Sequence, residues 1–180
     1  FVLRVGTSLE GAIFESMRSL SVSLQIDLDL LSVLCNKAIF VVKKHPGTVD
    51  ISTLTLGNAE HLFEAFGGCV KDKYQKEWLA ATHDVLAKHL PQLDEHCLTE
   101  MCEKWNSWVR SMVGTADSIN EFKRFVRARN QMAHDAPSEQ QMSSGNVFSA
   151  TFEGMRAYDR LLSASLRMQN SPTVNVARNG

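Results

Sequence analysis

Three side chains close together in the sequence, Arg129, Asn130 and His134, have the types and spacing that could bind and cleave a phosphodiester. Histidine takes or gives a proton near neutral pH. Arginine stays charged and offers a planar fork of donors that fits phosphate oxygens, so Arg129 could hold a phosphate and stabilise its developing charge. Asn130 stands four residues before His134, on nearly the same helix face, where its amide could orient the imidazole or bind a ribose. We therefore treat these three residues as the candidate catalytic set.

Helix geometry separates two of these side chains. Residues five apart on an ideal helix differ in direction by about 140°, so Arg129 and His134 do not naturally point to one place. Convergence requires the long reach of arginine, fraying or a kink near His134, or a second subunit that completes the site. Arg129 also continues an apolar stripe with helical spacing, formed by Ile119, Phe122, Val126 and Ala133. We therefore expect its head to face an interface or a cleft.

The spacing Arg-Asn-x-x-x-His, with four residues between the arginine and the histidine, resembles the signature of the HEPN family. In that family an arginine, a polar residue such as asparagine and a later histidine are followed by a turn and a last helix. The flanking segments are similar in order: a long helix leads into the motif, and a polar loop and a helix rich in Leu, Met and Phe follow it. The resemblance covers a core of about residues 70–170, and residues 1–65 neither add to it nor contradict it.

The resemblance implies a metal-independent endoribonuclease in which two such domains pair and bring both motifs into one composite cleft. Arg129, Asn130 and His134 would be its catalytic residues, with no cofactor and no metal, and RNA, a second copy of the chain and other domains of the parent protein as partners. Two alternatives stay open: a catalytically inactive HEPN module for RNA or nucleotide binding and dimerisation, and a helical protein-interaction domain. In the simplest interpretation, His134 and Arg129 only compensate the negative end of a helix dipole.

Basic residues close to the motif are candidate RNA-binding groups. The chain has a net charge of -1 and a pI of about 6.7, so a nucleic acid would have to be bound by a local patch. The predicted patch consists of Lys123, Arg124 and Arg127. A second cluster, less favoured because it lies far from the motif in sequence, consists of Lys71, Lys73 and Lys76. The alternative for both is an ordinary solvated helix face.

Cysteine and tryptophan residues are interpreted structurally. The four cysteines are scattered over helical segments, which favours a reducing, intracellular compartment, cytoplasmic or nuclear, over a disulfide scaffold. A zinc site near His89 and His96 is disfavoured because Cys97 and Cys102 lack the close pairing of zinc ligands, and we expect them to be small buried hydrophobes. The indoles are expected to pack in the core: Trp78, Trp105 and Trp108. No apolar run is long enough to span a membrane.

The elements that must position these residues are all predicted to be helices. We expect an all-α, irregular up-and-down bundle of about seven helices, HEPN-like, in one domain over residues 1–180. Its N-terminal helices, over residues 7–66, would pack on the HEPN-like core, and the chain, which opens at Phe1, would be a piece of a longer protein. Capping boxes predict helix starts at Thr7 and Ser118, and Asp94 is a third expected cap. The expected ends are His45-Pro46-Gly47, Gly67-Gly68, Pro91 and Gly114, and a last helix is expected from Val147.

Overall fold

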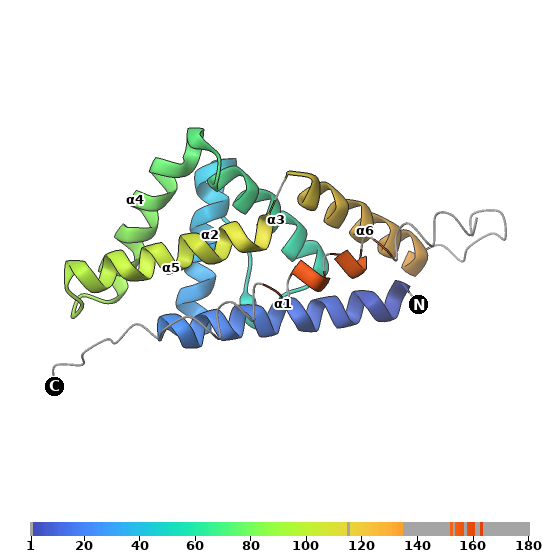
Figure 1. Ribbon diagram of the computed structural model, residues 1–180, viewed down its shortest axis with the longest axis horizontal. Helices are drawn as coiled ribbons and strands as arrows, with labels where there is room; N and C mark the ends of the chain where they lie inside the picture. The colour runs from blue at the N-terminus through green and yellow to red at the C-terminus, as the bar shows by residue number, and fades with distance from the viewer. Residues whose placement is uncertain are drawn as a thin grey trace.

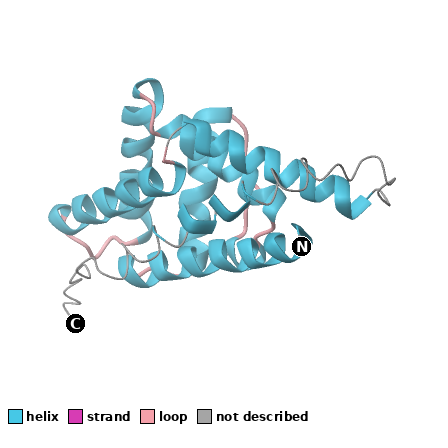
Figure 2. Ribbon diagram, turned by 45° about the vertical axis from the view of Figure 1, so that its right-hand side comes forward, coloured by secondary structure: helices cyan, strands magenta, loops and turns pink. Residues whose placement is uncertain are grey.

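The computed structural model describes the backbone of residues 2–114, 116–134, 152, 154–156, 158–160 and 163. The side chains of residues 7–114 and 119–130, and those of the eight positions between 152 and 163, are described as well. The elements are α1 (Val2–Leu24), α2 (Leu28–Lys43), the short 3-10 helix η1 (Ile51–Thr53), α3 (Leu56–Cys69), α4 (Asp72–His89), α5 (Glu95–Val113) and α6 (Ala116–His134). No strand occurs among these residues (Figure 2), so the all-α prediction is confirmed.

The helices form an irregular bundle rather than a set of parallel rods (Figure 1). In this view α1 forms the base, α5 runs roughly along its left-hand part, α2 stands steeply to both, and α3 slopes down to the right of α5. The helix α4 packs at one end against α2 and α5, and α6 packs at the other end against α3 and α1. The helix that carries the candidate motif is therefore held mainly by α3 and α1.

Local chemistry explains the predicted boundaries that are confirmed. The helix α2 ends where Lys44 adopts a left-handed conformation just before the predicted end at His45-Pro46-Gly47; its start at Asp27, which accepts a hydrogen bond from Leu30 N at 2.8 Å, was not predicted. Asp94 accepts from Cys97 N at 2.8 Å and starts α5. Gly114, with φ of 53°, ends that helix, as expected for a residue without a Cβ. The apolar stretch 39–42 lies in the last turns of α2 and is helical.

Three predicted boundaries are wrong. The helix expected to begin at Thr7 already begins at Val2, and the helix expected to begin at Ser118 begins at Ala116. The helix expected to stop at Gly67-Gly68 continues to Cys69. These glycines serve packing instead: a Cβ on Gly67 would lie 2.1 Å from Ile119 Cδ1 of α6, and one on Gly68 would lie 2.7 Å from Val42 Cγ1 of α2. The last helix, expected from Val147, falls outside the described residues except for helical positions between 152 and 163.

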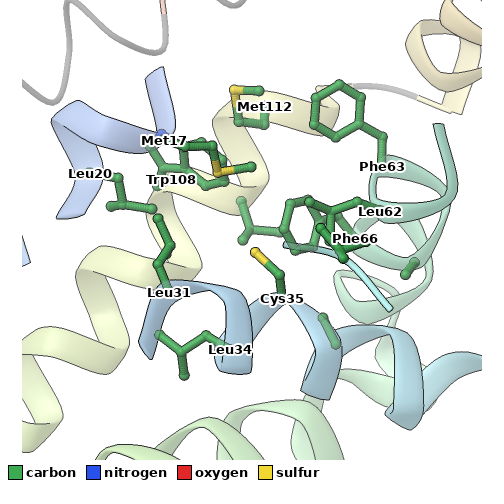
Figure 3. Close-up of a cluster of buried hydrophobic side chains, with 14 of the residues drawn as sticks. Met17, Leu20, Leu31, Leu34, Cys35, Leu62, Phe63, Phe66, Trp108 and Met112 are labelled. Carbon is green, nitrogen blue, oxygen red and sulfur yellow. The ribbon is translucent and has the colours of Figure 1, made fainter. Parts of the chain in front are cut away.

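A single hydrophobic core joins α1 to α6. Figure 3 shows side chains from α1, α2, α3 and α5 converging in it, among them Met17, Leu31, Phe66 and Trp108. The Phe66 ring meets Trp105 and Trp108 edge-on at centroid distances of 5.6 and 6.0 Å, and the two indoles stack on each other at 5.7 Å. Together with Trp78 these indoles are buried, so the prediction that they are core residues is confirmed.

The cysteines divide into two buried and two half-buried thiols. Cys35 and Cys69 are buried, and burial raises the pKa of both, that of Cys69 to about 12. Cys97 and Cys102 are only partly buried, so the expectation that they are small buried hydrophobes is wrong. Cys97 lies in the first turn of α5, next to its exposed cap, which leaves less covering structure around it. No helix in the described part of the chain has the length and apolar character needed to cross a bilayer.

Candidate functional site

The motif helix α6 is fixed to the rest of the molecule by one apolar face. Phe122, Phe125 and Val126 are buried, and the ring of Phe122 packs edge-on against Phe63 of α3 at a centroid distance of 5.0 Å. The glycine contact between α3 and Ile119 allows the two helices to approach closely. The apolar stripe predicted from the sequence is therefore the docking face of α6, at least as far as Val126.

Arg129 follows this buried stripe and is itself only partly exposed. Its Nη1 donates a hydrogen bond to Asn130 Oδ1 at 3.1 Å. Its Nε is buried and finds no hydrogen-bond partner among the described residues. A buried donor without a partner costs about 1–3 kcal/mol, and more when the group is charged. Asn130 thus holds the guanidinium through Nη1, while Nε remains a donor without a partner among the described residues.

A second face of α6 carries the polar positions. Residues 123, 127, 130 and 134 follow one another at spacings of four, three and four, which places them along one side of the helix. Arg127 is exposed and Asn130 half-buried, while the side chain of His134 lies outside the described part of the chain. Asn130 therefore stands where the two faces meet, since it contacts Arg129 and precedes His134 by one turn.

The structure brings Arg129 and Asn130 together, and the side chain of His134 lies outside the described residues. The backbone of α6 remains helical through His134, so the two residues keep the difference in direction of about 140° that the sequence predicted. Fraying before His134 is not what joins them. Their convergence stays a prediction, and it would require the reach of arginine or a second subunit.

Lys123 is part of an ion-pair bridge between three helices. Glu64 of α3 accepts hydrogen bonds from Lys123 Nζ at 2.6 Å and from Lys43 Nζ of α2 at 2.9 Å. These two bonds, that from Lys123 first, lower the pKa of Glu64 to about 2. Lys123 therefore has a structural partner, and its predicted contact with RNA would require it to share or leave Glu64. No observation tests whether Lys123, Arg124 and Arg127 contact RNA, so these contacts stay predictions.

Sequence reasoning missed both acidic partners around α6. Glu121, interpreted as part of a capping box, instead accepts hydrogen bonds from Arg156 at 2.8 Å and from Arg160 at 2.5 Å. Burial alone would raise the pKa of Glu121, but these hydrogen bonds outweigh it and the pKa is lowered. For Glu64 a signal existed, since it is the one acidic residue inside the apolar run 62–66. Such an isolated carboxylate needs a cationic partner.

The remaining candidate groups lie elsewhere. Lys71 is the cap residue of α4, and Lys71, Lys73 and Lys76 are exposed. His83 and His96 contact carboxylates of α5, at 2.9 Å from Glu95 and 3.4 Å from Glu100. In the part of the chain that is described, no group of three or more His, Cys, Asp or Glu side chains is arranged to hold a metal ion.

The geometry of α6 thus supplies a restrained guanidinium and a neighbouring amide, one turn before a histidine. Comparisons of the chain with models of known protein families, with curated proteins and with solved structures found no match.

Proposed function

We propose that this chain is a HEPN-type RNA-processing domain of an intracellular protein, and that it is a metal-independent endoribonuclease. One observation carries the proposal. The Arg129 guanidinium is positioned by Asn130 and has a buried Nε without a partner among the described residues. Keeping a charged group in that state costs stability, which favours a functional role, and the half-buried side chain, oriented by Asn130, can offer its terminal nitrogens to a phosphate oxygen.

Each of the three motif residues has a role in the proposed reaction. His134 takes the proton from the ribose 2'-hydroxyl, whose oxygen attacks the adjacent phosphorus while the bond from phosphorus to the 5'-oxygen breaks. A proton is returned to the leaving 5'-oxygen, so the products are a 2',3'-cyclic phosphate and a 5'-hydroxyl. Arg129 stabilises the charge that develops on the phosphate oxygens. Because Asn130 uses its Oδ1 for Arg129, its amide donors remain for the ribose or the imidazole.

The proposed site is formed by two copies of the chain. The straight course of α6 through His134 separates the directions of Arg129 and His134 on one copy. A second α6 related by a two-fold axis would place its histidine opposite the first arginine, and each copy would complete the other's site. The chain would act on RNA as this homodimer and beside other domains of a parent protein.

The test measures RNA cleavage by the purified chain in the presence of EDTA. Wild type should cut single-stranded RNA, whereas Arg129→Gln, Asn130→Ala and His134→Ala should fold and not cut. The matched control is Arg110→Gln, because Arg110 Nε also donates to an asparagine Oδ1, that of Asn106 at 3.2 Å, but on the exposed surface of α5. A wild-type chain without activity, or equal activity in Arg129→Gln and Arg110→Gln, would refute the nuclease.

One observation favours the second candidate, an inactive HEPN module that binds RNA. Lys123 shares the carboxylate of Glu64 with Lys43, so its positive charge beside the motif is partly compensated, which the sequence did not suggest. This module would bind RNA without cutting it, with an affinity that falls steeply with salt and decreases when Arg124 and Arg127 are replaced by glutamine. If the chain does not bind RNA and a protein is found bound to it instead, the third candidate, a helical protein-interaction domain, is favoured.

A further inference from the structure

A pocket of about 200 Å³ lies between the C-terminal half of α2, the loop that follows it and the first turns of α3. Ile39 and Val49 supply buried apolar wall. Its polar lining comes from five residues that carry hydrogen-bond donors: Lys43, His45, Thr48, Asn58 and His61. None of the described residues that line it is acidic. It lies outside the motif helix and has no role in the proposed cleavage.

The frame of this pocket is fixed by side chains of α2. Asn36 donates from Nδ2 to Val49 O and accepts from Val49 N at Oδ1, both at 2.8 Å. Ser32 Oγ accepts from Ile51 N at 3.0 Å. Gly47 lies so close to Asn36 that a Cβ would be 2.3 Å from its Oδ1, so only glycine fits there. Two hydrogen bonds at Val49 and one at Ile51, the first residue of η1, therefore tie this segment to α2 and hold the wall of the pocket in place.

The charge around the pocket favours an anion. Lys43 pairs with Glu64, which also binds Lys123, so two ammonium groups face one carboxylate and one positive charge remains uncompensated. Imidazole, amide and hydroxyl donors surround this charge. A phosphate group, with several acceptor oxygens and negative charge, matches such a lining better than a neutral or cationic ligand does.

We propose that this pocket is a binding site for a phosphate group, with Lys43, Asn58 and His61 as the contacting residues. The phosphate belongs either to a small molecule or to the backbone of an RNA, and the chemistry of recognition is shared by both. The site does not depend on the nuclease function, because it uses residues of α2 and α3 alone and would exist in an inactive chain.

The test follows the backbone amide signals of the whole chain by NMR while inorganic phosphate is added, against chloride at matched ionic strength. Phosphate should cause saturable shifts at residues 43–45, 47–49, 58 and 61, and His61→Ala or Asn58→Ala should weaken binding about tenfold. The control is His96→Ala, which removes a histidine that is 82% exposed on α5. The proposal is wrong if wild type shows no saturable shift, or if His61→Ala binds phosphate as well as His96→Ala does.

Two further titrations identify the source of the phosphate. A 5'-mononucleotide and a short single-stranded RNA are each added to the phosphate-saturated chain. Displacement by the mononucleotide at the lower concentration supports a small-molecule ligand, and displacement by the RNA at the lower concentration supports a backbone phosphate. If neither displaces the inorganic phosphate, the assignment of the pocket to a phosphate-bearing ligand is overturned.

Discussion

Replacing Glu64 by glutamine removes the one carboxylate that joins α2, α3 and α6. The pKa of Glu64 lies at about 2 in the folded chain, below its ordinary value of 4.5, because Lys123 and Lys43 donate hydrogen bonds to its charged form. That interval corresponds to about 3 kcal/mol between the two protonation states. The side chain is 42% exposed, so solvent screens the pairs, and we expect about 1–2 kcal/mol of this to contribute to stability. Glu64→Gln should therefore lower the free energy of unfolding by this amount at pH 7.

The dependence on pH has a definite direction. Because folding lowers the pKa of Glu64, the stabilisation is fully present above pH 4.5 and is lost as the pH falls toward 2. Thermal unfolding of wild type and Glu64→Gln should differ by about 2–4 °C per kcal/mol at pH 7 and converge near pH 2. Glu77→Gln is the control, because Glu77 pairs with Lys44 on the exposed surface. Equal effects of both substitutions at pH 7, or a difference that persists at pH 2, would refute this account of the bridge.

Three other outcomes follow from the packing. Gly68→Ala should lower the free energy of unfolding by about 1–3 kcal/mol, because the added Cβ would clash with the side chain of Val42 in α2. Gly11→Ala, which has open space around it, should instead raise the free energy of unfolding by up to about 1 kcal/mol. Urea unfolding measures both changes. Cys35 and Cys69 should stay unreactive toward a thiol reagent at pH 8 until the chain unfolds, and rapid reaction in the native state would contradict their burial. Arg129→Met should leave the melting temperature unchanged or raise it, because it removes a buried donor without a partner; a large decrease would mean that the guanidinium is structural.

Local signals predicted most of the fold. Asp94 and Gly114 act through their own backbone neighbourhood, so their boundaries could be predicted from the sequence. The periodic apolar stripe of α6 likewise predicted its docking face. The predicted helix end at Gly67-Gly68 was wrong because these glycines allow close contact with helices that are distant in sequence. A local sequence pattern cannot show such a contact.

The candidate site was predictable only in part. The sequence indicated that Arg129 continues a buried stripe, and the structure agrees that its Nε is buried. It gave no indication that Lys123 would be held by Glu64, because that pair joins residues 59 positions apart. The pocket beside Lys43 was missed for the same reason, since its walls come from two helices and a loop that only the fold brings together.

The central claim is that the Arg129 guanidinium stabilises charge on a scissile phosphate. The rate of single-turnover RNA cleavage in EDTA tests it most directly when Arg129→Gln is compared with Arg110→Gln at equal folded concentration. We expect the Arg129 variant to be slower by about 10²–10³-fold, the usual loss when one donor to a developing oxyanion is removed, and the Arg110 variant to match wild type. An Arg129→Gln chain that cleaves RNA at the wild-type rate would contradict the claim.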